Sequence, residues 1–421
     1  MNNTMRTKEK GTVKDYIEEH WPQTIRENRK DSGNVHDSKG ELIGMPYPYS
    51  IPAVGYFDEM YYWDTYFTNK GLEISGRMLQ AKNNTDNMLY LVDRFGFMPN
   101  GNRSSYLKNS QPPYLSLMVR DIYEFYHDPV WLRGAIPILE REYLFWMTKR
   151  KTECGLNCYS GSPSADLFAH LAQDYAFRSG NHPGKSERDI AMHYITTCES
   201  GWDTTPRWGE EAYNYACIDV NSLLYAMERN MAFFAQELKE NADVWENRAE
   251  QRGKRMRDLM LDEKGIFCDY NFAEKQRSDL LSVAAFYPLF VEMATAEEAE
   301  ALHMQLDRLE ADYGVLTCEK REHLGTYQWD YPNGWACLQY IAIKALENYG
   351  FHKDARRLAK KYVSLVDRIF AETGNLWEKY NVVRGNLDVN HENKNKKMPA
   401  MMGWTAGVYL LMDKYLGTGC F

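Results

Sequence analysis

The sequence has 421 residues, of which 44% are hydrophobic and 26% are charged, with a formal net charge of −9 at pH 7. This apolar content is enough to bury the core of one large domain. No segment is dominated by lysine and arginine, so the basic surface that nucleic-acid binding requires is missing and nucleic-acid partners are excluded.

The N-terminal residues are polar and charged, without the apolar region of a secretory signal, and no later stretch reaches the apolar length of a membrane span. We therefore expect a cytoplasmic protein without a membrane partner. A single catalytic domain is expected over residues 1–421, with residues 1–45 as a possible N-terminal extension. The eight cysteines are scattered, and Cys154 and Cys158 have no second pair or histidine at zinc spacing, so we expect free thiols.

Helical periodicity recurs along the chain. Apolar side chains three and four positions apart predict a helix over residues 221–238, namely Leu224, Met227, Met231, Phe234 and Leu238. Residues 295–306 begin with Thr295 and have Glu298 three positions later, the pattern of a capping box. Residues 336–350 are periodic up to Gly350, a typical residue just after a helix. Residues 355–370 and 405–417 show the same period and strand signals are weak, which predicts a mostly α protein.

Aromatic residues make up 14% of the chain, and many of them lie in non-periodic segments. Four such segments combine Trp or Tyr with Asp, Asn or Gln: residues 58–67, 99–113, 199–208 and 328–339. A sugar ring packs on a flat aromatic surface, and its hydroxyls need polar side chains. The four segments together predict a carbohydrate pocket built by loops on a helical scaffold.

Two acids are candidates for chemistry in these loops. Asp203 stands in CESGWDTTPRW, where it could cap a helix or be one half of a pair of carboxylates that breaks a glycosidic bond. Glu378 follows an apolar Leu-Trp pair in GNLWEKYNVVRGN, where it could orient a water or pair with Lys379 or a nearby arginine at the surface. In the polar loop 386–399, a metal site at His391 and Glu392 is less expected than a solvated turn.

From about Pro48 to Leu411 the sequence resembles the trehalase family of glycoside hydrolases. The resemblance rests on the order and spacing of YYWDTYF, PNGNRSSYL, SQPP, ESGWDTTPRW, QWDYPNGW, WEKYNV and GWTAGV. It implies an all-α fold, an (α/α)6 toroid of helical hairpins. It also implies an inverting hydrolase of a small carbohydrate, with no metal and no other cofactor.

The resemblance makes Asp203 the general acid and Glu378 the general base. In an inverting enzyme the acid protonates the leaving oxygen while the base activates a water, at a separation of about 6.5–9.5 Å. Asp203 must then carry a proton, which Trp202 and a neighbouring carboxylate such as Glu199 would favour. The resemblance implies contacts with the substrate or a place in the same pocket for Tyr61, Trp63, Asp64, Asn100, Ser110, Gln111, Gly201, Trp202, Gln328, Trp329, Asn333, Trp335 and Trp404.

Several family positions are changed. Arginine or other charged contacts of the family are replaced at Tyr56, Asn109, the His182–Gly184 segment and Glu187. The glycine-rich loop with its glutamate is replaced by residues 386–399, where Glu392 is out of register. These changes predict an intact site for the cleaved sugar and a rewritten site for the leaving group, into which Lys185 or Arg188 would reach.

Three functions follow from this pattern. The first is hydrolysis of the α-glucosidic bond of trehalose or a related α-glucoside. The second is hydrolysis of glucosylglycerate, mannosylglycerate or another α-glycoside. The third is sugar binding without catalysis, which the retention of both Asp203 and Glu378 argues against, because a binding protein needs no such pair.

Overall fold

The computed structural model describes residues 11–32, 40–161, 163–180, 182, 184–323, 325–391, 398–400 and 403–421. Its α-helices are α1 (Val13–His20), α2 (Tyr62–Ile74), α3 (Met78–Phe95), α4 (Leu115–Tyr126), α5 (Pro129–Lys149), α6 (Phe168–Ser179), α7 (Glu187–Ser200), α8 (Ile218–Glu237), α9 (Asp243–Met260), α10 (Tyr287–Phe290), α11 (Ala296–His303), α12 (Ala336–Asn348), α13 (His352–Thr373) and α14 (Gly403–Thr418). Its strands are β1 (Ile25–Arg26), β2 (Tyr49–Ser50), β3 (Tyr215–Ala216), β4 (Tyr270–Asn271), β5 (Gln276–Arg277), β6 (Glu310–Ala311), β7 (Gly314–Val315), β8 (Asn333–Trp335) and β9 (Lys379–Asn381).

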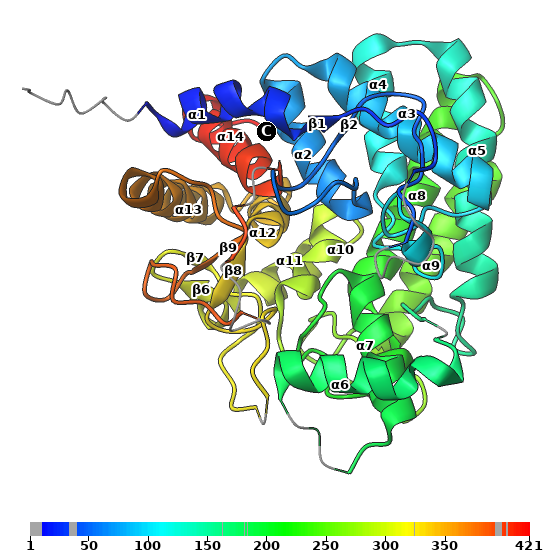
Figure 1. The fold of residues 1–421 in the computed structure, drawn as a ribbon. Coiled ribbons are helices and arrows are strands. Elements are labelled where there is room, and N and C mark those ends of the chain that lie inside the picture. Colours follow the sequence, from blue (N-terminus) through cyan, green and yellow to red (C-terminus); the bar gives the residue numbers. More distant parts are fainter. Residues whose placement is uncertain are drawn as a thin grey trace, which may run out of the picture.

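Alternate helices form a closed inner ring. α2 contacts α4, α4 contacts α8, and the ring continues through α10, α12 and α14 back to α2. A second set of helices packs on the outside: α3 and α5 against α4, α9 against α8, and α13 against α12 and α14 (Figure 1). This arrangement confirms the predicted (α/α)6 toroid.

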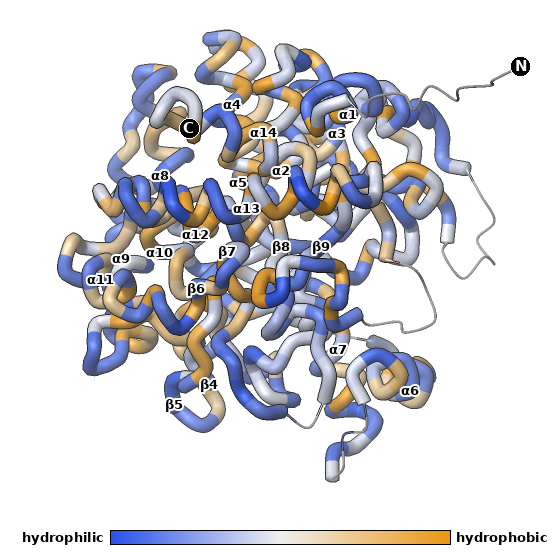
Figure 2. The backbone as a smooth tube through the Cα atoms, turned by 90° about the vertical axis from the view of Figure 1, so that its left-hand side faces the viewer, coloured by the Kyte–Doolittle hydropathy of each residue, from blue (hydrophilic) through white to orange (hydrophobic). Residues whose placement is uncertain are grey.

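The amino-acid pattern explains which helices are inner and which are outer. Nearly every residue of α12 and of α14 up to Met412 is buried, as expected for a helix that is apolar all round. In α13 hydrophobic and hydrophilic residues alternate, and only one side is buried (Figure 2). The helix predicted over 221–238 is α8, in which Leu224, Met227, Met231 and Phe234 are all buried.

The predicted helix ends are also present. The hydroxyl of Thr295 accepts from the amide of Glu298, and the Glu298 carboxylate accepts from the amide of Thr295, which is the predicted capping box of α11. Gly350 follows α12 with a φ of +81°. The helices predicted over 355–370 and 405–417 lie within α13 and α14.

Two glycines let the ends of the ring meet. Gly71 of α2 and Gly407 of α14 face each other, and a Cβ built on Gly71 would lie 2.5 Å from the Cα of Gly407. A Cβ on Gly407 would collide with the carbonyl of Phe67. The ring therefore closes through direct backbone contact between α2 and α14.

The strands are short antiparallel pairs that hold loops together. β8 pairs with β9, and Trp335 lies opposite Lys379 in this pair. The other pairings are β1 with β2, β6 with β7, and the three-stranded sheet β3-β4-β5. With two or three residues each, these strands leave the described chain mostly helical, as predicted.

The N-terminal segment shares the main core, because Val13, Ile17 and Trp21 belong to the same buried cluster as the inner helices. In the described parts of the chain, no helix is both long and apolar enough to cross a membrane. The eight cysteines are free thiols, and Cys158, Cys217, Cys318 and Cys337 are buried.

Candidate active site

One pocket of about 810 Å³ collects side chains from all the sequence segments that predicted a sugar site. Both candidate acids line it. The predicted residues in its wall are Tyr61, Trp63, Asp64, Asn100, Gln111, Gly201, Asp203, Gln328, Trp329, Trp335, Glu378 and Trp404. Segments up to about 340 residues apart in the sequence therefore meet at one opening, as a toroid allows.

Three predicted site residues lie behind the wall and are not among the residues that line the pocket. The Ser110 hydroxyl donates to the carbonyl of Met98 at 2.7 Å. Trp202 is fully buried and stacks on Trp329, with ring centroids 5.6 Å apart. The Asn333 amide donates to the carbonyl of Gln328 at 2.8 Å. Each of the three supports a residue of the lining.

Four tryptophans form an aromatic wall near Glu378. Trp329 and Trp335 are parallel, with ring centroids 3.7 Å apart and an interplanar angle of 1°. Trp404 meets both edge-on, and Trp63 lies 5.5 Å from Trp329. Such a surface offers a sugar ring flat apolar contact.

Glu378 faces a buried cation as well as the pocket. Its Oε2 accepts from Nζ of Lys379 at 2.5 Å, and the side chain of Lys379 is 0% exposed. The pairing with Lys379 considered from the sequence therefore exists, but inside the protein and not at its surface. Beside this pair, burial raises the pKa of Asp64 to about 7, and the neighbouring carboxylate of Glu378 contributes to this rise.

Asp203 sits on a tight turn after α7. Gly201 ends the helix with a φ of +76°, and a Cβ there would lie 2.7 Å from the ring of Trp63, so conformation and space both require glycine. No helix begins directly after Asp203, because the next α-helix is α8 at Ile218, and this excludes the capping role considered from the sequence. Burial raises the pKa of the Tyr106 and Tyr194 phenols, and the charge of Asp203 contributes to both shifts.

Glu199 does not act as an uncompensated neighbour of Asp203. Both of its oxygens accept from Arg150 at 2.7 Å, and the amides of Ser110 and Ser160 also donate to it. Glu199 therefore ties the wall segments together as a paired anion. The expectation that its charge keeps Asp203 protonated is not supported by this geometry.

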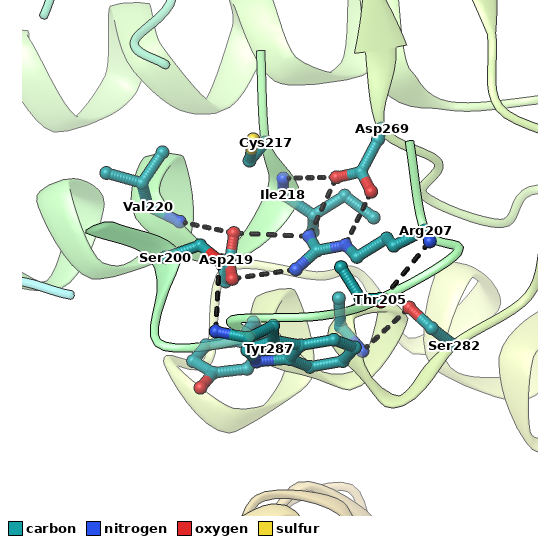
Figure 3. A network of polar contacts seen from close by, with 12 residues as sticks. Ser200, Thr205, Arg207, Cys217, Ile218, Asp219, Val220, Asp269, Ser282 and Tyr287 are labelled. Carbon is teal, nitrogen blue, oxygen red and sulfur yellow. Dashed lines mark hydrogen bonds and ion pairs between the residues drawn. The ribbon is translucent and has the colours of Figure 1, made fainter. Parts of the chain in front are cut away.

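A buried ion cluster of Arg207, Asp219 and Asp269 lies close to Ser200 and Thr205, which flank the turn (Figure 3). Arg207 is 1% exposed and donates to Asp219 at 2.8 Å and to Asp269 at 2.6 Å. Its guanidinium also lies over the rings of Trp202 and Trp208, 4.8 and 4.6 Å from their centroids. The residues around Asp203 are thereby fixed to α8 and to the segment between α9 and β4.

Helix α6 forms a wall that the sequence did not reveal. Leu171, Asp174 and Arg178 of α6 line the pocket, together with Leu167, which precedes the helix, and with Tyr194 and Ile195 of α7. Tyr194 donates to Asp174 at 2.8 Å, and Arg178 donates to the same oxygen at 3.0 Å. The spacing of these α6 residues marks one helix face, but nothing in the sequence tells whether that face meets a core or a pocket.

The changed family positions are distributed differently from the prediction. Asn109 lines the pocket, whereas Tyr56, Gly184 and Glu187 do not. His182 bonds to Ser179 and Glu210, and Pro183 lies outside the described residues.

Lys185 and Arg188, which were expected to reach into the leaving-group site, lie outside the pocket. Lys185 pairs with Glu211 at 2.6 Å and Arg188 with Asp189 at 3.3 Å, and neither lines the pocket. That prediction is wrong, and Lys108 and Arg178 are the basic residues of the lining.

The described residues contain no group of three or more His, Cys, Asp or Glu side chains placed to hold a metal. Of the polar loop 386–399, the structure describes residues 386–391, 398 and 399, so Glu392 lies outside the described residues.

Comparison with known proteins agrees with this site. The trehalase family model matches residues 2–417. A periplasmic trehalase of Xanthomonas oryzae pv. oryzae is 32% identical, over 97% of this chain and 74% of the relative. The structure of neutral trehalase from Saccharomyces cerevisiae superposes with a TM-score of 0.77 at 26% identity, covering 97% of this chain and 81% of that one. A mannosylglycerate hydrolase from Thermus thermophilus shares the fold, with a TM-score of 0.63 at 16% identity over 87% of this chain and 95% of that one.

Proposed function

This chain belongs to the trehalase family of glycoside hydrolases, and we propose that it hydrolyses the α-glucosidic bond of trehalose or a closely related α-glucoside with inversion of configuration. Asp203 is the general acid and Glu378 the general base. The observation that carries the proposal is that both carboxyl groups line one pocket of about 810 Å³. They reach it from different loops, as two acids on opposite sides of a bound sugar require.

The two acids have neighbours suited to different parts of the substrate. Glu378 lies with Gln328, Trp335 and Asp64, which suits the ring and hydroxyls of the sugar to be cleaved. Asp203 lies with Tyr106 and Tyr194, next to α6, which makes that side the place of the leaving group.

In the reaction, Asp203 donates its proton to the glycosidic oxygen as the bond from that oxygen to the anomeric carbon breaks. Glu378 accepts a proton from a water whose oxygen forms the new bond to the anomeric carbon from the opposite face. The products are a β-configured sugar and the released alcohol. The proton that Asp203 lost and the one that Glu378 gained are exchanged with solvent before the next turnover.

The leaving-group side supports trehalose as the first candidate. Both trehalases described above are similar to this chain over most of its length. Of the positions changed from the family, Asn109 is the one that lines the pocket within the described residues, so its replacement is the lost charge-assisted contact that we weigh here. Such a contact is worth about 1.5–3 kcal/mol, and we expect kcat/KM for trehalose to lie about 10- to 150-fold below that of an efficient trehalase.

A specific observation favours a second candidate, an α-glucoside with a small acidic leaving group such as glycerate. Lys108 lines the pocket, and its charge contributes to lowering the pKa of the exposed Asp166, so its ammonium can also meet the carboxylate of a leaving group. Glucosylglycerate hydrolysed faster than trehalose, together with loss of that preference in Lys108→Met, would establish the second candidate over the first.

The roles of the two acids are tested with trehalose and α-glucosyl fluoride, whose fluoride leaves without a proton. Asp203→Asn should lose about 10²–10⁴-fold on trehalose and far less on the fluoride. Glu378→Gln should lose comparably on both, because each reaction needs the activated water.

The control is Glu142→Gln, which changes a buried carboxyl outside the pocket and should keep wild-type turnover. The circular dichroism of all variants must match wild type. Near-normal trehalose turnover in either acid variant would refute the role assigned to that residue.

A further inference from the structure

A lysine behind the pocket wall joins two of its lining side chains. Nζ of Lys379 donates to Oε2 of Glu378 at 2.5 Å and to Oε1 of Gln328 at 3.1 Å. It also lies 4.5 Å from the ring centroid of Trp335. Glu378, Gln328 and Trp335 all line the pocket, whereas Lys379 does not.

The backbone sets this contact. Lys379 is the first residue of β9 and lies opposite Trp335 of β8. The indole of Trp404 donates to the carbonyl of Glu378 at 3.2 Å, which fixes the residue before the strand. A fully buried ammonium is costly unless its charge is paired, so Lys379 holds its position only with the carboxylate beside it.

The charges that face Glu378 come from three elements. They are the ammonium of Lys379 on β9, the carboxyl of Asp64 on α2 and the thiol of Cys337 on α12. The charge of Glu378 contributes to raising the pKa of both Asp64 and Cys337. Asp64 disfavours a second negative charge, and the ammonium favours it. Lys379 is therefore the cation that faces the Glu378 carboxylate next to another acid.

We propose that Lys379 is a positioning residue for catalysis. Its ammonium fixes one oxygen of Glu378 and leaves the other oxygen for the attacking water, while it holds the amide of Gln328 against the sugar. The inference rests on the proposed role of Glu378 as the base. A residue that only stabilised the fold would change the free energy of unfolding and leave the pH dependence of the reaction unmoved.

The test compares Lys379→Met with Lys70→Met. Lys70 is a matched control, because its ammonium is also largely buried, pairs with Asp121 at 2.5 Å and Glu73 at 3.5 Å, and lies near the ring of Tyr66, but outside the pocket. The measurements are kcat and KM as a function of pH on α-glucosyl fluoride, and the melting temperature of each variant.

Lys379→Met should lower kcat by about 100-fold, the cost of a misplacement of about 1 Å at a reacting group. The acidic limb of its pH profile should move to higher pH, because the carboxylate has lost the cation beside it. Lys70→Met should lose stability and keep both kcat and the position of the limb.

An unchanged acidic limb in Lys379→Met, or an equal loss of kcat in Lys70→Met, would overturn the inference. Where Lys379→Met does not fold, Lys379→Gln keeps a donor without the charge and should show the same movement of the limb. Failure of the proposed function can be told apart from failure of this inference. If Glu378 is not the base, Glu378→Gln stays active; if only the inference about Lys379 fails, Glu378→Gln is still inactive.

Discussion

At the scale of single residues, the two acids differ in what surrounds them. Asp203 stands on a turn that requires glycine at position 201, and it lies beside the phenols of Tyr106 and Tyr194. Glu378 stands beside an ammonium and an aromatic wall. The roles proposed for them, donor of a proton and acceptor of a proton, need such different surroundings.

The sequence motifs predict both acids and many of the residues that line the pocket, because these residues lie in short segments that combine aromatic with polar side chains. They could not separate the lining from its support. Ser110, Trp202 and Asn333 stand next to lining residues in the sequence, yet their side chains turn to the protein interior. The burial of Lys379 had one local signal, since it lies among Leu376, Trp377, Tyr380 and two valines.

Glu142 gives a prediction at the residue scale. Burial raises the pKa of Glu142 from 4.5 to about 7, so the folded protein holds a proton that the unfolded chain releases. The stability that this group contributes is complete below about pH 4.5 and is lost as pH rises to about 7. Glu142→Gln should therefore gain stability relative to wild type across this window, by at most about 1.4 kcal/mol per pH unit, and stay level above it.

Urea unfolding at pH 4.5, 5.5, 6.5 and 7.5 measures this difference. Glu140→Gln, which removes an exposed carboxylate from the same helix, is the control and should show no such rise. A constant difference between Glu142→Gln and wild type at all four pH values would contradict the assignment.

At the scale of elements, local sequence predicted helices better than their arrangement. α8, α12, α13 and α14 follow from periodicity, and the start of α11 follows from its capping box. The strands were not predicted, because a pair such as β8 and β9 consists of three residues each and depends on a partner about 45 positions away. The pocket-lining face of α6 was not predicted, because the residue spacing of a helix face is the same whether it packs against a core or lines a pocket.

The contact between α2 and α14 predicts opposite effects for two glycines of one helix. Gly407→Ala should destabilise the protein by about 1–3 kcal/mol, because the new methyl collides with the carbonyl of Phe67 and forces the helices apart. Gly417→Ala, where a Cβ meets nothing within 4 Å, should stabilise it by about 0.5–1 kcal/mol through helix propensity. Denaturant unfolding of both variants checks the pair, and equal effects would rule out ring closure through Gly407.

The α6 face predicts an effect that depends on the leaving group. Leu171→Ala should raise KM for trehalose several-fold, because the released sugar loses an apolar contact of about 1–2 kcal/mol. KM for α-glucosyl fluoride should not change, since fluoride does not reach α6. Phe177→Ala, an exposed residue of the same helix outside the pocket, is the control. An equal rise in KM for both substrates would mean that α6 does not contact the leaving group.

At the scale of the whole molecule, the ring brings loops from distant parts of the chain to one pocket. Its inner helices run in the order α2, α4, α8, α10, α12 and α14, so neighbours in the ring are separated in sequence by outer helices and loops. The order of the ring is set by long-range packing and is not visible in periodicity, so the toroid was available from the family resemblance alone. The cytoplasmic location stays a prediction.

The most direct test of the central claim is to identify the anomer that the wild-type protein releases first from α-glucosyl fluoride. Proton NMR detects this anomer before mutarotation mixes the two forms. Attack by a water held by Glu378, on the face opposite the leaving group, predicts β-glucose as the first product. Release of α-glucose first would mean that configuration is retained, and would contradict the assignment of Asp203 and Glu378 as the acid and base of an inverting hydrolase.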